Sequence, residues 1–105
     1  MPNISRRHDE PVEPDIQTTA FTATVEKVYR LDPTSANFDV HLPTASGVGG
    51  QDILLYVDYS GLNTVVVTPS GVETVNGVPG IILGTRESVI LTSNGIDDWI
   101  GFGAP

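Results

Sequence analysis

Apolar and polar residues alternate along much of the chain after Ala20. Between Asn37 and Leu42, the apolar residues Phe38, Val40 and Leu42 are separated by polar ones. A period of two is typical of a β-strand with one buried face, because successive side chains point to opposite sides of a sheet. We therefore predict that Phe38, Val40 and Leu42 face a core, while the residues between them face solvent.

Similar segments predict further strands, and glycine and proline mark the turns between them. In residues 21–27, Phe21, Ala23 and Val25 again share one face. No window of eleven or more residues has a helical repeat. The expected strands cover residues 21–27, 37–42, 52–57, 64–68, 72–75, 81–83, 88–92 and 98–102. This pattern predicts an all-β domain over residues 20–105, either a small antiparallel β-sandwich or a barrel.

The last two expected strands predict a hairpin around Asn94 and Gly95, because both residue types tolerate a positive φ. Trp99 follows this turn and has the largest apolar side chain in the protein. We interpret Trp99 as a core anchor. The alternative is an exposed platform on which a sugar ring stacks.

Two runs, Ile53-Leu54-Leu55 and Val65-Val66-Val67, are apolar on both faces of their strands. In a two-layer domain of this size one face of each strand should meet water, so a second apolar face needs a cover. A homo-oligomer interface would supply it. Loops or the N-terminal segment folded over central strands would do the same.

Residues 1–19 differ in amino-acid composition from the rest of the chain. Three prolines are interspersed with charged residues, and the apolar residues are isolated. Such a segment buries too little surface to offset its ordering entropy. We expect an N-terminal arm over residues 1–19 that is disordered or lies extended along another surface.

Composition removes several classes of function. The chain has 105 residues, no cysteine and a net charge of −8, so disulfides and cysteine-based metal sites are excluded. From Leu31 onward only Arg86 opposes eight carboxylates, a net charge of −7. Because nucleic acids and anionic membranes are bound through lysine and arginine, we expect neither as a partner. No segment has the apolar length of a membrane-spanning helix or the pattern of a signal peptide.

No catalytic constellation is visible. His8 lies in the arm and His41 on the outward side of a strand, and there is neither a nucleophile elbow nor a phosphate-binding loop. Asp97 and Asp98 are interpreted as turn residues, and Asp52 and Asp58 as lying at opposite ends of one strand. In an oligomer such carboxylates could converge on a symmetry axis around a cation. We predict no enzymatic activity, cofactor or metal site.

One resemblance covers about two-thirds of the chain. The segments that carry it are 38–46, 49–55, 65–69, 73–77, 87–95 and 98–103, in that order. Together they resemble a β-module of bacteriophage fibre, neck-appendage and capsid-decoration proteins. The resemblance implies a non-enzymatic part of a virion that is commonly homotrimeric. Fibre modules often belong to much longer chains, and this difference favours a small decoration protein.

The sequence thus predicts a capsid decoration, or cement, protein that binds the outside of a phage head as a homotrimer after synthesis in the host cytoplasm. Its partners would be the major capsid protein and itself. The arm residues expected to contact the capsid are Ile4, Arg6, Arg7, Val12 and Ile16. The alternative is a fibre or neck-appendage adhesion module that binds a host-surface glycan through Trp99, Tyr56, Tyr59 and nearby carboxylates.

Overall fold

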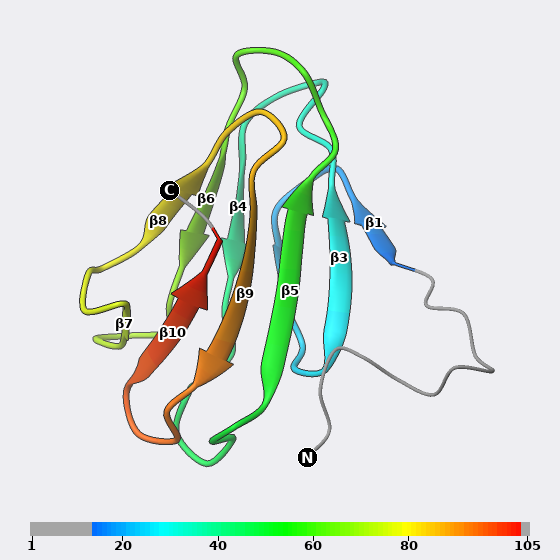
Figure 1. The fold of residues 1–105 in the computed structure, drawn as a ribbon. Helices are drawn as coiled ribbons and strands as arrows, with labels where there is room; N and C mark the ends of the chain where they lie inside the picture. Colours follow the sequence, from blue (N-terminus) through cyan, green and yellow to red (C-terminus); the bar gives the residue numbers. More distant parts are fainter. Residues whose placement is uncertain (1–13, 104–105) are drawn as a thin grey trace, which may run out of the picture.

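The computed structural model describes residues 14–103, which form two β-sheets packed against each other (Figure 1). Within these residues no helix is present, so none could span a membrane. The six-stranded sheet has the order β1-β3-β5-β9-β10-β7, and the four-stranded sheet has the order β2-β4-β6-β8. The strands are β1 (Asp15–Gln17), β2 (Phe21–Thr22), β3 (Lys27–Leu31), β4 (Phe38–His41), β5 (Asp52–Val57), β6 (Val65–Thr68), β7 (Thr74–Val75), β8 (Ile81–Leu83), β9 (Ser88–Ser93) and β10 (Asp98–Phe102).

The all-β prediction is confirmed, but the sheets are mixed rather than antiparallel, and they do not close into a barrel. From β1 to β6 each connection crosses to the other sheet, so β3 lies beside β5 and β4 beside β6. Because two crossings restore the direction of the chain, these neighbours run parallel. Antiparallel pairing appears only later, between β6 and β8, β5 and β9, and β9 and β10. The sequence pattern gives strand positions but not the sheet that each strand enters.

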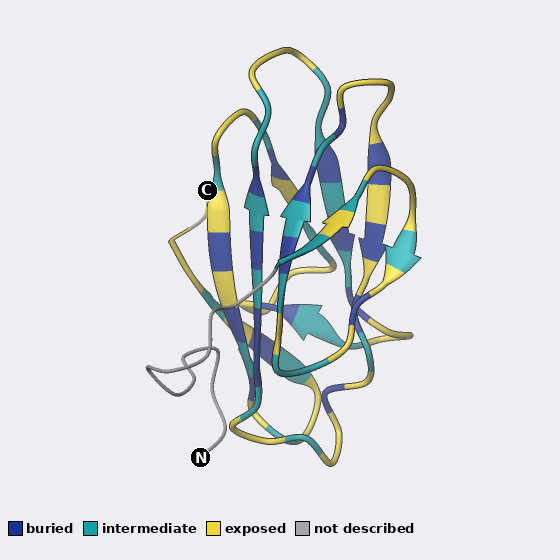
Figure 2. Ribbon diagram, turned by 90° about the vertical axis from the view of Figure 1, so that its right-hand side faces the viewer, coloured by how far each residue is buried: buried dark blue, intermediate teal, exposed yellow. Residues whose placement is uncertain are grey.

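The core lies between the two sheets, and exposed and buried residues alternate along the longer strands (Figure 2). Phe38, Val40 and Leu42 are buried, while Asp39 and His41 are exposed, so the predicted facing of this strand is confirmed. Trp99 on β10 is completely buried. Large apolar residues from both sheets surround the same interior, including Leu31, Ile53, Leu55, Leu83 and Leu91.

The strand expected over residues 21–27 is wrong in its extent. β2 ends at Thr22, and the chain then turns through Glu26, whose φ is +66°. β3 begins at Lys27 in the other sheet, where the sequence pattern predicts no separate strand. The Glu26 amide donates to the Asp52 carbonyl (2.6 Å), and Glu26 Oε2 accepts from the Asp52 amide (2.9 Å). These two bonds hold the turn against the start of β5.

The ordered sheet begins earlier than the expected domain boundary at Ala20. β1 pairs in parallel with β3, which places Ile16 opposite Arg30. Lys27 Nζ lies 3.1 Å from Asp15 Oδ2, and a hydrogen bond to this carboxylate raises the pKa of the exposed Lys27 ammonium group. The expected arm therefore overlaps the sheet at residues 15–17, while its first thirteen residues lie outside the described part of the chain.

Candidate functional site

The outer face of the six-stranded sheet, turned away from the four-stranded sheet, carries a continuous row of apolar side chains. Val28 on β3 pairs with Leu54 on β5, Leu54 pairs with Ile90 on β9, and Ile90 pairs with Phe102 on β10. We call these four residues the apolar row. Val28 and Leu54 are half-buried, whereas Ile90 is 40% and Phe102 is 63% exposed. The exposure of the row therefore rises toward its β10 end.

Further apolar side chains extend this surface on both sides of the row. Ile100 pairs with Thr92 on one side, and Ile16 lies on the other side in a register line with Arg30 and Tyr56. Ile16 is 56% and Ile100 is 36% exposed. In Figure 1 the strands that carry this surface, β1, β3, β5, β9 and β10, lie side by side. The outer face thus carries apolar side chains on five of its six strands, with polar side chains such as Arg30 and Thr92 between them.

The charges beside this surface are neutralised within the chain. Arg30 Nε lies 2.8 Å from Asp58 Oδ2, and Arg86 Nη1 lies 3.3 Å from Asp58 Oδ1. With the Lys27–Asp15 pair, these contacts engage every lysine and arginine between residues 14 and 103. Each of the three cations in the described part of the chain therefore already has a carboxylate neighbour.

The outer face of the four-stranded sheet is more polar. A cross-strand line joins Asp39, Val66 and Ile82, and the next outward line joins Thr22, His41 and Thr68. Asp39 and His41 are both exposed. Each of the two runs expected to be apolar on both faces has one outward residue. Leu54 belongs to the apolar row, whereas Val66 lies beside Asp39 on the other sheet.

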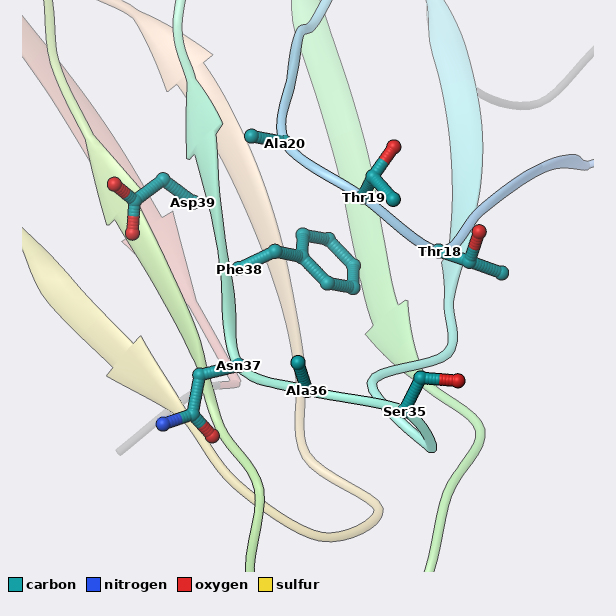
Figure 3. Close-up of a pocket in the computed structure, with 8 residues that line it drawn as sticks. All are labelled: Thr18, Thr19, Ala20, Ser35, Ala36, Asn37, Phe38 and Asp39. Atoms are coloured by element: carbon teal, nitrogen blue, oxygen red, sulfur yellow. The ribbon is translucent and has the colours of Figure 1, made fainter.

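A shallow groove of about 440 Å³ opens between the β1–β2 connection and the β3–β4 connection. The ring of Phe38 lies between these two segments (Figure 3). Hydroxyl groups and small side chains form most of the rim, and the groove is lined by Thr18, Thr19, Ala20, Ser35, Ala36, Asn37, Phe38 and Asp39. Asp39 is the only titratable residue in this lining.

The loops that follow β4, β6 and β9 are tied together at one end of the sandwich. Glu73 accepts hydrogen bonds from the Thr44 hydroxyl group and the Ala45 amide, both at 2.8 Å. The buried Ser93 hydroxyl group donates to the Ala45 carbonyl at 2.7 Å. Val72 and Ile96 are 98% and 71% exposed on these loops. These side-chain contacts add to backbone hydrogen bonds between the β4–β5 loop and the end of β9, such as the bond from the Gly50 amide to the Ser93 carbonyl (2.9 Å).

The acidic residues considered for metal binding have internal partners instead. Asp98 Oδ1 accepts from the Thr74 hydroxyl group (2.7 Å) and the Gly77 amide (3.2 Å), and Asp52 Oδ1 accepts from the Thr92 hydroxyl group (2.6 Å). Among residues 14–103, no group of three or more histidine and acidic side chains is arranged to hold a metal ion. We therefore assign no metal centre to residues 14–103.

Of the capsid-binding and core residues singled out from the sequence, the structure describes Ile16 and Trp99. Ile16 lies on β1, whereas Ile4, Arg6, Arg7 and Val12 fall outside the described residues. Trp99 is 0% exposed and so offers no stacking surface for a glycan.

The sequence analysis marks Leu54 as apolar on a second face but misses the three residues that complete the row. Val28, Ile90 and Phe102 each occupy the outward phase of a period-two pattern, which was the available signal. Comparison with protein-family models gives no match, and a search of the curated proteins gives none either.

Proposed function

We propose that this chain is a structural protein of a bacteriophage particle, a decoration protein that binds the outside of the capsid as a homotrimer. The N-terminal residues Ile4, Arg6, Arg7 and Val12 extend to the major capsid protein, and Ile16 joins that segment to the sheet. The protein is made in the host cytoplasm and functions on the assembled head. It carries out no chemical reaction.

The observation that carries this proposal is the apolar outer face of a small acidic β-sandwich. Exposed apolar areas of more than a few hundred Å² are uncommon on monomeric proteins and are typical of interaction surfaces. The sandwich has no disulfide to reinforce it, and association between subunits is a common source of stability for domains of this size. The resemblance to phage β-modules supplies the identity of the particle.

The charge distribution supports attachment through the N-terminal segment. Arg6 and Arg7 are the two lysine or arginine residues that lie outside residues 14–103. The other three, Lys27, Arg30 and Arg86, lie within that range and already have carboxylate partners. Three such segments in one trimer would act together, because binding of the first raises the effective concentration of the others. Modest contacts with the capsid would then give stable decoration.

The experiment is to add the purified protein to heads that lack decoration and to image the particles. Regular density at many equivalent positions over the head supports the proposal. Density only at one vertex or along a fibre would favour the adhesion alternative. No association with heads at any concentration below aggregation would contradict a decoration function.

A further inference from the structure

We propose that the outer face of the six-stranded sheet, centred on the apolar row, is the surface through which copies of this chain associate. The inference rests on the self-association that the proposed function requires, and it assigns that association to particular residues. In a ring of three, each copy turns this face toward the common axis. Phe102 of one copy then meets the Val28 and Leu54 end of the row in the next.

The area of the face is of the order that a stable contact needs. Four neighbouring strands of five or six residues (β3, β5, β9 and β10) and the three-residue β1 form this face. With a spacing of ~4.8 Å between strands and a rise of ~3.3 Å per residue, they give a face of roughly 20 by 20 Å before side chains corrugate it. Stable protein interfaces bury about 800 Å² of accessible surface on each partner. The projecting Ile90, Phe102 and Ile16 side chains increase the accessible area of this face toward that value.

The charges of the face favour a second copy over an oppositely charged partner. Of the ten Asp and Glu residues between 14 and 103, only Asp52 and Asp98 occupy outward positions on its strands. Each accepts a hydrogen bond from a threonine hydroxyl group. Two chains with net charge −8 repel each other least where carboxylates are few and already engaged. The apolar row is such a place, whereas the opposite sheet presents Asp39.

The shape of the row also suits a contact between its two ends. Exposure rises from the half-buried Val28 and Leu54 to Phe102 at the edge of the β9–β10 pair. The exposed ring of Phe102 on one copy can therefore cover the Val28 and Leu54 end of the row on another. Such a contact removes the Phe102 ring from water.

The test places one charge on each outer face and measures the mass of the protein by light scattering. Ile90→Lys puts an ammonium group in the middle of the row. Ile82→Lys is the matched control, because Ile82 is also an isoleucine on a strand and is more exposed, at 57%, but lies on the four-stranded sheet. We expect the unchanged protein and Ile82→Lys to have about three times the mass of 11.2 kDa, and Ile90→Lys to have one-third of that mass.

Folding is checked by the fluorescence of Trp99, whose complete burial makes it a reporter of the core. If Ile90→Lys does not fold, Phe102→Ser provides a second variant, because it removes the projecting ring at the strand end without adding charge. The same lower mass is expected for it. Folded variants of both residues that keep the full mass would overturn the assignment of this face.

Other outcomes distinguish a failure of this interface assignment from a failure of the proposed decoration function. A monomeric unchanged protein that still decorates heads would contradict both the face and the trimer, but not capsid binding. A trimer broken equally by Ile82→Lys and Ile90→Lys would contradict the face alone. If Ile90→Lys keeps its mass but no longer binds heads, the occupant of the face is the capsid protein rather than a second copy, and the inference is wrong.

Discussion

Gly49 and Gly95 pack backbone against backbone, which joins the β4–β5 loop to the β9–β10 turn. A Cβ atom on Gly49 would lie 3.1 Å from Gly95 Cα, and one on Gly95 would lie 3.2 Å from Gly49 Cα. Gly95 also has a φ of +84°, in the region that favours glycine. Position 95 therefore favours glycine for two reasons: the positive φ of the turn and the close contact with the Gly49 backbone.

Gly95→Ala should destabilise the protein by about 1–3 kcal/mol, because it combines a strained φ with a close backbone contact. Urea unfolding followed by Trp99 fluorescence would measure the change. Ser46→Ala is a suitable control in the adjoining loop, since Ser46 is exposed and should change stability by less than about 0.5 kcal/mol. Equal stability of the two variants would show that the glycine contact has little energetic weight.

Trp99→Ala should reduce the free energy of unfolding by roughly 3–5 kcal/mol, because the side chain fills the space between the two sheets. Trp99→Phe should cost less, since a phenyl ring fills much of the same volume. It also removes the indole N–H, which is buried without a hydrogen-bond partner. Thermal unfolding followed by circular dichroism suits both variants. A loss below about 1 kcal/mol for Trp99→Ala would contradict the role of Trp99 as core anchor.

Glu73 should contribute to stability through the two hydrogen bonds that its carboxylate accepts from the β4–β5 loop. We expect Glu73→Ala to cost about 2 kcal/mol, because hydrogen bonds to charged groups contribute roughly 1.5–3 kcal/mol. Glu73→Gln should lose only part of this, since an amide oxygen can still accept from Ala45. Hydrogen exchange at the Ala45 amide would localise the effect. Unchanged protection of that amide in Glu73→Ala would show that the hydrogen bond from the Ala45 amide to Glu73 is not formed in solution.

The sequence predicted the strands better than their arrangement. β5, β8 and β10 have their expected bounds because turn residues flank short apolar runs. The pattern at residues 21–27 failed because its alternation continues through Glu26, where the backbone turns into the other sheet. Nothing in a period of two distinguishes a return within one sheet from a crossing to the other. The parallel pairs therefore could not be predicted.

The same limit explains why only part of the candidate surface was visible in the sequence. Leu54 was noticed because it lies between two other apolar residues, whereas Val28 lies just beyond the strand expected over residues 21–27. The four residues of the apolar row come from four strands, and only the observed register aligns them. Strand order across the sheet is a tertiary property.

The N-terminal segment should divide into a part needed for binding and a part needed for folding, with the division at Pro14. A chain that begins at Pro14 keeps β1, and its Tm should stay within a few degrees of the full chain. A chain that begins at Ala20 loses the pairing of β1 with β3, the Lys27–Asp15 ion pair and the hydrogen bond from the Asp32 amide to the Gln17 carbonyl. A loss of 1–2 kcal/mol would lower Tm by roughly 5–15 °C in a domain of this size.

Both shortened chains should fail to bind undecorated heads if Ile4, Arg6, Arg7 and Val12 are the contacts with the capsid. The full-length variant in which Arg6 and Arg7 are both replaced by Glu keeps the length of the segment and reverses its cationic charge. It should bind more weakly than the unchanged protein if the two arginines meet capsid carboxylates, and the unchanged protein should then lose affinity as salt is raised. Full binding by the chain that begins at Pro14 would instead place attachment on the acidic sandwich and contradict the role of the N-terminal segment.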